Sequence, residues 1–403
     1  FVHSIKQYKF NEVGMVKNIS TAYNPAWNEK SFFSEVEIQA EKGYPDFSQT
    51  LNMAFIGKVS CGKSSLVNAL LRKERGDTIA KVGAKAGVTT KREPWKLDDH
   101  VTLMDSPGLD DVHVKNSKVT KKFLENIDVG VLVVTGALDK AQKKHLDDLR
   151  VRKCNSIFVV LNKIDEWDKL RRSALESVID QWKSGLQIDK IYPVCAFGYD
   201  PETAPDVLLD LRGVDQLRGD IEIFLDEQGK DLLLARQMDQ KQLYATKIIV
   251  SALVAVAGQV FLPGSAAFIV ATQASAIASL YYLYNGKLLD PKVAISLLPY
   301  FASESIVPDV FLFVQSFIPP TGVIDLAAAV TAVITTFGIL ATVNYLLATG
   351  VEITERQRLK EVFGKYKTQA TQEVFFGVEF EMLKNYDYIQ QIVKRLLMSQ
   401  AIA

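Results

Sequence analysis

The sequence is poor in cysteine and has no surplus of charge of either sign. Its three cysteines, Cys61, Cys154 and Cys195, form no C-x-x-C pair and no metal-binding spacing. This excludes a disulfide-stapled scaffold and a cysteine-rich zinc site, and it favours a reducing compartment. Because 47 basic residues balance 47 acidic ones, a generally basic nucleic-acid-binding protein and an acidic solvating tail are also excluded.

Charge is scarce above all in one long region near the C-terminal end. Runs of 39 residues (248–286) and 26 residues (326–351) carry no charge at all. Apolar runs above about 18 residues are typical of membrane-spanning segments. The 104 residues 248–351 contain only six charged side chains, namely Lys287, Asp290, Lys292, Glu304, Asp309 and Asp325. A normally charged protein is therefore joined to an almost uncharged one.

The hydrophobic pattern and the composition divide the chain into three predicted parts. We expect a partly helical N-terminal extension (1–50), an α/β domain (51–228) and a helical domain (229–403). In the α/β domain, short apolar runs alternate with helical patterns, which predicts βαβ units and a mostly parallel sheet with helices on both faces. The predicted strands are 51–56, 101–105, 128–134, 156–161 and 191–194.

Proline and glycine divide the helical domain. Pro-Gly at 263–264, Asp-Pro at 290–291 and Pro-Pro at 319–320 are natural helix breaks. The predicted hydrophobic helices, which lie within about 248–349, are 248–261, 265–285, 292–316 and 322–349. Residues 352–403 return to a charged pattern and are predicted to form amphipathic helices.

A phosphate-binding pattern, G-x4-G-K-S/T, follows the first predicted strand and precedes a helical stretch. Its glycines let successive N–H groups point at a phosphate, and the N-terminus of the following helix adds partial positive charge. Lys63 is predicted to reach the β- and γ-phosphates, and the Ser64 hydroxyl to bind Mg²⁺. The nucleotide-binding residues predicted in this loop are Gly57, Lys58, Val59, Ser60, Cys61, Gly62, Lys63, Ser64 and Ser65.

Two further motifs mark the γ-phosphate and the base. Asp105 of D-S-P-G ends a predicted strand and is expected to hold Mg²⁺ through water, while Gly108 donates an N–H near the γ-phosphate. In N-K-I-D, the Asp165 carboxylate can accept both the N1–H and the N2 amino protons of guanine, a pattern that adenine does not offer. Asn162 and Lys163 are the other base-binding residues predicted there. Each motif lies at the carboxyl end of a strand, where open α/β sheets bind ligands.

A third motif, of three residues, completes the predicted nucleotide site. Cys195-Ala196-Phe197 follows the last predicted strand and would place a backbone N–H on the guanine O6 atom. Cys195 and Ala196 are therefore added to the predicted nucleotide-binding residues. Because the motifs occur in this order, each at a strand end, the predicted nucleotide is GTP.

Residues from about 50 to 228 resemble a translation-factor-class G domain of the Era and dynamin type, a P-loop GTPase. The motifs GKVSCGKSS, VTTK, DSPG and NKID carry the resemblance. It departs at Cys195-Ala196-Phe197, where Era-like proteins usually have Ser-Ala-Lys. The resemblance implies a GTP hydrolase with Mg²⁺ held by Ser64, Thr90 and Asp105. Thr90 is preferred to Thr89 as the switch residue that senses the γ-phosphate, because a basic residue follows it.

The resemblance also bears on catalysis, for which Lys63, Thr90 and Ser60 are the implied residues. Ras-like enzymes orient the attacking water with a Gln after D-x-x-G, but here that position is Leu109, so hydrolysis is expected to be slow unless stimulated. The resembled families often use K⁺ or Na⁺ and a nucleotide-dependent homodimer. Ser60 occupies the dynamin-type position for a contact near the bridging oxygen, although an ordinary small loop residue remains an alternative.

Two interpretations of the apolar helices stay open. In the first they enter a lipid membrane, since a 26-residue helix spans about 39 Å and the hydrocarbon core is about 30 Å thick. In the second they form the core of a soluble bundle, with Gln259, Gln273, Ser275 and Asn344 as internal hydrogen bonders. The segment VAGQVFLPGSAAFIVATQ resembles a tail domain of unknown function found after G domains in bacterial Era-like GTPases. That tail is usually regarded as membrane-associated, which favours the first interpretation.

The expected function is thus a GTPase that couples GTP hydrolysis to a membrane-associated helical domain, in dynamin-like remodelling or anchoring. Its G domain would lie in the cytoplasm or a stroma-like reducing compartment. A soluble GTP switch whose helical bundle binds protein partners is the alternative. Ribosome assembly is disfavoured and no nucleic-acid partner is expected, because no basic RNA-binding domain follows the G domain. The chain begins with Phe1, so removal of an N-terminal segment stays open.

Overall fold

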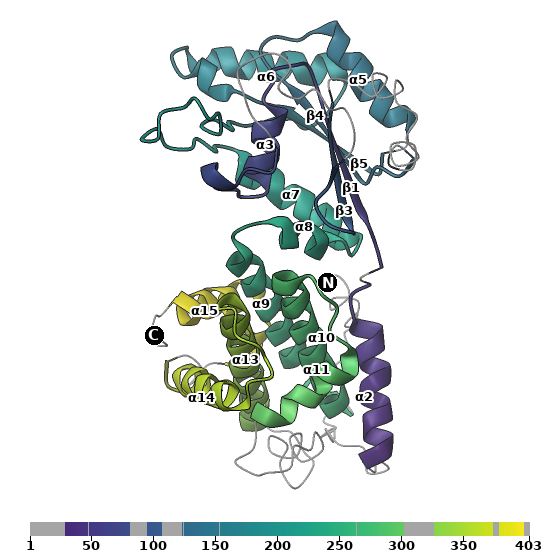
Figure 1. Ribbon diagram of the computed structural model, residues 1–403, viewed down its shortest axis with the longest axis vertical. Helices are drawn as coiled ribbons and strands as arrows, with labels where there is room; N and C mark the ends of the chain where they lie inside the picture. The colour runs from purple at the N-terminus through teal and green to yellow at the C-terminus, as the bar shows by residue number, and fades with distance from the viewer. Residues whose placement is uncertain are drawn as a thin grey trace. The chain divides into compact units, whose positions relative to one another are not determined.

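A computed structural model describes residues 29–46, 48–80, 95–106, 123, 125–152, 154–262, 264–301, 326–373 and 379–398. The chain divides into two compact units, which are coloured along the sequence in Figure 1. The α/β unit comprises residues 48–239, and the helical unit comprises residues 1–47 together with 240–403. The predicted combination of an α/β domain with a helical region is confirmed.

The sheet of the α/β unit has the strand order β2-β3-β1-β4-β5-β6 and is parallel except for the β2–β3 pair. All five predicted strands are present, and β2 is an addition at the edge. Every residue of β4 is buried, as expected for a parallel strand covered on both faces. The strands are β1 (Leu51–Ile56), β2 (Trp95–Lys96), β3 (Val101–Ser106), β4 (Val129–Val134), β5 (Ser156–Leu161) and β6 (Tyr192–Pro193).

Helices cover both faces of this sheet. Alternate residues of β1 point to opposite sides: Ala54 and Ile56 join the core that includes Trp182, while Met53 and Phe55 face a small apolar cavity. The sequence pattern also predicts a helix at about 117–126, but these residues lie mostly outside the described part of the chain. The helices are α3 (Lys63–Leu70), α5 (Lys140–Val151), α6 (Arg172–Leu186), α7 (Val214–Glu227) and α8 (Asp231–Gln237), with the 3-10 turns η1 (Arg75–Asp77) and η3 (Ile164–Trp167).

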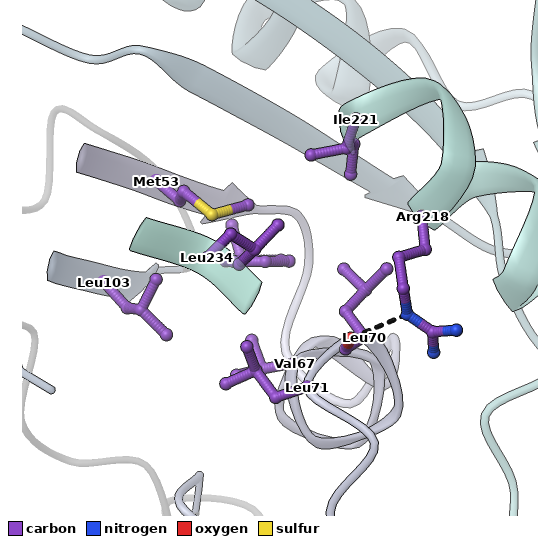
Figure 2. A pocket seen from close by; sticks show the side chains of 9 residues that line it. Met53, Val67, Leu70, Leu71, Leu103, Arg218, Ile221 and Leu234 are labelled. Atoms are coloured by element: carbon purple, nitrogen blue, oxygen red, sulfur yellow. Dashed lines mark hydrogen bonds between the residues drawn. The ribbon is translucent and has the colours of Figure 1, made fainter. Parts of the chain in front are cut away.

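The structure places the boundary between the units after Asp239, not after residue 228 as the sequence suggests. The intervening helix α8 brings Leu234 to the apolar cavity, which Met53 and Leu103 also line (Figure 2). Arg236 Nε also donates to Asp98 Oδ2 at 3.1 Å. These partners precede α8 by about 130 to 180 positions in the chain. The local sequence of α8 therefore does not indicate that this helix belongs to the α/β unit.

The helical unit is built around three apolar helices. α9 (Lys241–Gln259), α10 (Ser265–Asn285) and α13 (Leu326–Ala348) pack against one another. α2 (Glu29–Gly43) packs on α10, so the segment expected to be a separate N-terminal extension belongs to this unit. The remaining elements are α11 (Pro291–Leu297), η4 (Leu298–Phe301), α14 (Arg356–Glu373), η5 (Phe380–Lys384) and α15 (Tyr386–Met398).

The helix predicted at 292–316 is shorter in the structure. α11 begins with Pro291 after Asp290, whose side chain accepts the Lys292 N–H at 2.8 Å as an N-cap. It ends at Leu297, because Pro299 cannot continue the ladder of helical hydrogen bonds. Residues 302–325 lie outside the described part of the chain.

Segments of α9, α10 and α13 are long and apolar enough to cross a membrane by length and composition. They are Lys241–Gln259, Ser265–Asn285 and Ala329–Ala348, and 67%, 89% and 83% of their most apolar windows are buried within the protein. α14 packs on α13 and α15 packs on α9. In the described part of the chain, the apolar side chains of these helices are therefore covered mainly by other protein side chains.

Polar side chains connect the three helices. Gln273 Nε2 donates to Thr336 Oγ1 at 2.9 Å, and Thr272 Oγ1 donates to Gln259 Oε1 at 3.1 Å. Asn344 bonds to Gln242 and Tyr284, as described below. Three of the four internal hydrogen bonders expected for a bundle are thus confirmed. The Ser275 hydroxyl has no hydrogen-bond partner among the described residues.

Candidate nucleotide-binding site

The phosphate loop connects β1 to α3 and requires glycine at two positions. A Cβ on Gly57 would lie 2.1 Å from the Val133 carbonyl oxygen of β4, a steric clash. Gly62 has a φ of 85°, and a Cβ on it would lie 2.4 Å from Asn162 Nδ2. Glycine therefore lets the loop pass close to β4 and to the N-K-I-D motif at the same time.

The N-terminus of α3 opens into this loop. Gly62 provides no side-chain cap, and the first turn of α3 contains no acidic residue. Its N–H groups and partial positive charge are therefore left for an anion. Ser60 adopts a left-handed conformation with a φ of 64°, which costs about 1–3 kcal/mol for a residue other than glycine. The exposed Ser60 thus contributes to the curled backbone that a phosphate cradle needs.

Lys63 lies beneath the loop and is 7% exposed. Its Nζ atom donates to the carbonyl oxygens of Gly57 at 3.0 Å and Lys58 at 2.9 Å. It also lies 3.6 Å from Asp105 Oδ1. The ammonium group is therefore held at the N-terminus of α3, directly next to the phosphate loop.

Ser64 and Asp105, two of the predicted metal ligands, are in direct contact. Ser64 Oγ donates to Asp105 Oδ2 at 2.6 Å, so a hydroxyl from α3 meets a buried carboxylate from the end of β3. Mg²⁺ typically takes one or two protein oxygens and completes its shell with phosphate oxygens and water. This oxygen pair fits Mg²⁺. The described residues contain no group of three or more His, Cys, Asp or Glu that would form a separate metal site.

The N-K-I-D motif joins the base site to the phosphate loop. Asn162 is 2% exposed, and its Nδ2 atom donates to the Cys61 carbonyl at 3.0 Å. Lys163 has a left-handed backbone, with a φ of 62°, and directly precedes the 3-10 turn η3. The partly exposed Asp165 side chain follows in that turn. The structure thus brings both predicted halves of the nucleotide site to one edge of the sheet.

Cys195 presents its thiol, and not its backbone N–H, to the N-K-I-D motif. Its N–H donates to the Arg212 carbonyl at 2.8 Å, and the Phe197 N–H donates to the Asp210 carbonyl at 3.0 Å. Of the three residues of this motif, Ala196 is therefore the one whose backbone N–H remains the candidate for the predicted contact to guanine. The Cys195 Sγ atom lies 3.2 Å from Asp165 Oδ1. Burial, followed by the bond to Asp165, raises the thiol pKa to about 12, so the group is protonated and donates to the carboxylate.

Several predicted residues lie outside the described part of the chain or make no distinctive contact. Thr90 and its neighbour Thr89, and likewise Gly108 and Leu109, are outside it, so their roles stay predictions. Ser65 lies in the first turn of α3. Val59 is an exposed residue of the phosphate loop. Lys58 pairs with Asp139, which begins the approach to α5.

Sequence reasoning misses a buried amide on α3. The Asn68 Oδ1 atom accepts the N–H groups of Ile79 and Ala80, both at 3.0 Å, and Nδ2 donates to the Ala80 carbonyl at 2.9 Å. These bonds fix the chain just before residues 81–94, which contain the predicted switch threonine. A fully buried Asn on a largely apolar helix is the signal that could have identified it.

A buried arginine holds the other end of α3. Arg218 of α7 is 3% exposed, and it donates to the carbonyls of Leu70 at 2.9 Å and Ala69 at 2.7 Å, as Figure 2 shows for Leu70. Carbonyls at a helix C-terminus favour a cation. Nothing in the local sequence of α7 indicates this role, because the partners are almost 150 positions earlier. No predicted nucleotide-binding residue lines the adjoining cavity.

Comparisons with known proteins fall on the α/β unit. Residues 52–163 match the protein family described as "50S ribosome-binding GTPase". GTPase Der of Nautilia profundicola is 34% identical over 154 residues, which cover 36% of this chain and 31% of that protein. The probable GTP-binding protein EngB of Buchnera aphidicola is 28% identical over 165 residues, covering 38% of this chain and 67% of that protein.

Among solved structures, Era in complex with MgGDPNP and a 16S ribosomal RNA fragment is 18% identical, with a TM-score of 0.30, covering 52% of this chain and 68% of that chain. The chain spans only about a third of the length of the Der and MnmE relatives that it matches. The matched segment contains the phosphate loop, Asp105 and Asn162, which the structure brings to one edge of a mostly parallel sheet. Over residues 52–163, the α/β unit of this chain is therefore similar to P-loop GTPases.

Proposed function

We propose that the chain binds GTP at this site and hydrolyses it to GDP and phosphate. The observation that carries the proposal is the bond from Asn162 Nδ2 to the Cys61 carbonyl at 3.0 Å. It joins the phosphate loop to the N-K-I-D motif, so that a triphosphate and a guanine base can be bound by one continuous set of residues.

The residues divide the work by their chemistry. Lys63 and the open N-terminus of α3 neutralise the phosphates, and Asp165 accepts the N1–H and N2 amino protons of guanine. Ser64 and Asp105, with Thr90 as a third ligand, would hold Mg²⁺. When bound, Mg²⁺ withdraws charge from the β- and γ-phosphate oxygens. Cys195 keeps the Asp165 carboxylate turned toward the base by donating to Oδ1.

Turnover is expected to be slow in dilute protein and to rise with protein concentration and with K⁺. Leu109 offers no hydrogen-bonding group to an attacking water, so positioning must come from a second copy of the chain, from a monovalent cation near Ser60, or from both. Phosphate release measured from 0.1 to 20 µM protein (a test range, roughly spanning weak self-association), in K⁺ and in Na⁺, checks this. A specific rate that is independent of both variables would refute the dimer and cation proposals and favour a slow regulatory switch.

A second candidate function, membrane attachment, is favoured by the three apolar helices. Gln242 at the start of α9, Tyr284 at the end of α10 and Asn344 near the end of α13 meet at one end of the bundle. Tyr284 Oη donates to Asn344 Oδ1 at 2.8 Å, and Asn344 Nδ2 to Gln242 Oε1 at 3.1 Å. α10 and α13 are therefore parallel, so α13 begins at the end of the bundle opposite to the one at which α10 ends.

This topology limits how the unit could enter a bilayer. If α9, α10 and α13 all spanned it, residues 286–325 would have to connect the two sides of the bilayer, and their sequence contains the charged residues Lys292, Glu304 and Asp309. The α9–α10 hairpin has both its outer ends on one side and carries no charge from residue 248 to 286. We therefore propose that the hairpin alone inserts, beginning with its exposed tip, and that the bundle opens for this.

The tip offers a direct test of membrane attachment. Leu262 is 38% exposed at the hairpin turn, so Leu262→Asp should leave the bundle folded but release the protein from liposomes and make it extractable from membranes by carbonate. Leu288→Asp, at a residue that is 61% exposed elsewhere in the unit, is the matched control and should stay bound. Wild-type protein that never floats with liposomes would refute this candidate. Cosedimentation with ribosomes would instead favour a ribosomal function, as the description of the matched family suggests.

A further inference from the structure

The base site has two walls that come from different parts of the chain. One wall is the N-K-I-D motif with the η3 turn, which Asp168 directly follows. The other is the segment Cys195-Ala196-Phe197. The Ile164 N–H donates to the Val194 carbonyl at 3.2 Å, and the Cys195 thiol lies 3.2 Å from Asp165 Oδ1. These two bonds, one from the backbone and one from a weak thiol donor, hold the walls together only weakly. The site must nevertheless place the Asp165 carboxylate accurately enough to hydrogen-bond to the base.

Arg212 adds a stronger link between these walls. Its Nη1 and Nη2 atoms donate to the two carboxylate oxygens of Asp168 at 2.8 and 2.7 Å. Its Nε atom lies 3.0 Å from both Asp210 oxygens, and Nη2 also reaches Asp210 Oδ2 at 2.7 Å. One planar guanidinium thus bonds in fork geometry to two carboxylates, which a lysine cannot reproduce.

Both carboxylates are tied by backbone bonds to residues of the base site. The Asp168 N–H donates to the Asp165 carbonyl at 3.2 Å. Asp210 pairs with Phe197 in a β-bridge, and the Arg212 carbonyl accepts the Cys195 N–H at 2.8 Å. Hydrogen bonds from Arg212 hold the pKa of Asp168 and of Asp210 below the usual value, so both stay charged at neutral pH.

We propose that Arg212 is a positioning residue for guanine recognition, which clamps segment 195–197 to the η3 turn and so fixes Asp165 against the base. The inference rests on the proposed binding of GTP. Exposed ion pairs are individually weak, and the Arg212 side chain is 48% exposed. Its effect is therefore on the geometry of Asp165, and it should show in base discrimination more than in protein stability.

The experiment compares dissociation constants for GTP and ITP in the wild type and in four variants, using displacement of a fluorescent GDP. Arg212→Ala and Asp168→Asn should each weaken GTP binding about fivefold. ITP, which lacks the N2 amino group, should be affected less, so the GTP/ITP ratio falls. Arg212→Lys should give an intermediate loss, and the losses should shrink at high salt. Arg172→Ala, which removes an exposed pair with Glu176 on α6, is the control.

Each outcome decides between supporting and overturning the clamp. A wild-type GTP affinity in Arg212→Ala, an equal loss for GTP and ITP, or the same loss in Arg172→Ala would overturn it. If Arg212→Ala proved too unstable to assay, Asp168→Asn would decide alone. A wild type that binds neither GTP nor GDP would instead refute the proposed function.

Discussion

Replacing Lys63 with alanine should lower GTP affinity by roughly a hundredfold or more. The Lys63 ammonium is buried beneath the phosphate loop, 2.9 to 3.0 Å from two loop carbonyls. When a triphosphate binds, the ammonium exchanges these neutral carbonyl acceptors for charged phosphate oxygens. Hydrogen bonds to charged groups contribute about 1.5–3 kcal/mol each, and two of them correspond to at least a hundredfold in affinity.

The same substitution could also destabilise the fold, so the experiment needs a control for stability. Removing the ammonium leaves Asp105, 4% exposed and 3.6 Å away, without that cation, so the variant could lose stability as well as affinity. Thermal unfolding should therefore be measured beside nucleotide binding by titration calorimetry. Lys143→Ala on the exposed face of α5 removes one positive charge from the same unit and should bind as the wild type does. GTP affinity retained in a folded Lys63→Ala variant would refute the phosphate-loop assignment.

The strands and the phosphate loop could be predicted because their signals are local. β1, β4 and β5 are short apolar runs bounded by polar residues, and their bounds agree with the predicted ones to within one residue. In the phosphate loop, Gly57 and Gly62 are required by close approaches to β4 and Asn162. Such requirements appear in the sequence as a fixed spacing, which is why this part of the site could be located before the structure was known.

Contacts between distant segments left no such signal. Arg218 caps a helix almost 150 positions earlier, and α8 joins the sheet through Asp98. The two-residue edge strand β2 is too short for any periodicity. The Cys195 thiol can donate to Asp165 because the last strand ends beside the N-K-I-D turn. This proximity depends on the order of the strands in the whole sheet.

The apolar helices show a limit of another kind. α10 is buried along almost its whole length and is apolar on every side, and a helix that is apolar all round fits either a protein core or a bilayer. Its sequence is therefore compatible with both interpretations. What the structure adds is that Gln273 Nε2 donates to Thr336 Oγ1 across the bundle. The closed bundle thus gives a partner to a polar group that would be costly in lipid, and the proposed opening of the bundle would break this bond.

Asp165→Asn should shift nucleotide preference from GTP to XTP, with GTP affinity falling about a hundredfold. The carboxylate accepts two protons from guanine, at N1 and at the N2 amino group. An asparagine amide offers one acceptor and one donor, which leaves the guanine amino group facing another donor. Xanthine carries an oxygen in place of that amino group, so its edge matches the amide.

Cys195 is expected to set the orientation of that new amide. In the wild type its thiol donates to Asp165 Oδ1 at 3.2 Å, and in the Asp165→Asn variant the same donor would favour the amide oxygen at that position. The amide nitrogen is then turned toward the other base contact, where xanthine presents its oxygen. Adding Cys195→Ala should remove this preference and let the amide adopt both orientations, so XTP affinity should fall in the double variant while Cys195→Ser on the same background should retain it.

The measurement is competition of GTP, XTP and ATP against fluorescent GDP or XDP in each variant. Phosphate release with XTP should recover in D165N, because the phosphate-binding residues are unchanged, and this recovery separates altered base recognition from misfolding. Equal affinities for GTP and XTP in the wild type would mean that Asp165 does not contact the base. A D165N protein that lost GTP without gaining XTP, yet kept its wild-type thermal midpoint, would show that the carboxylate orders the η3 turn rather than reading the base.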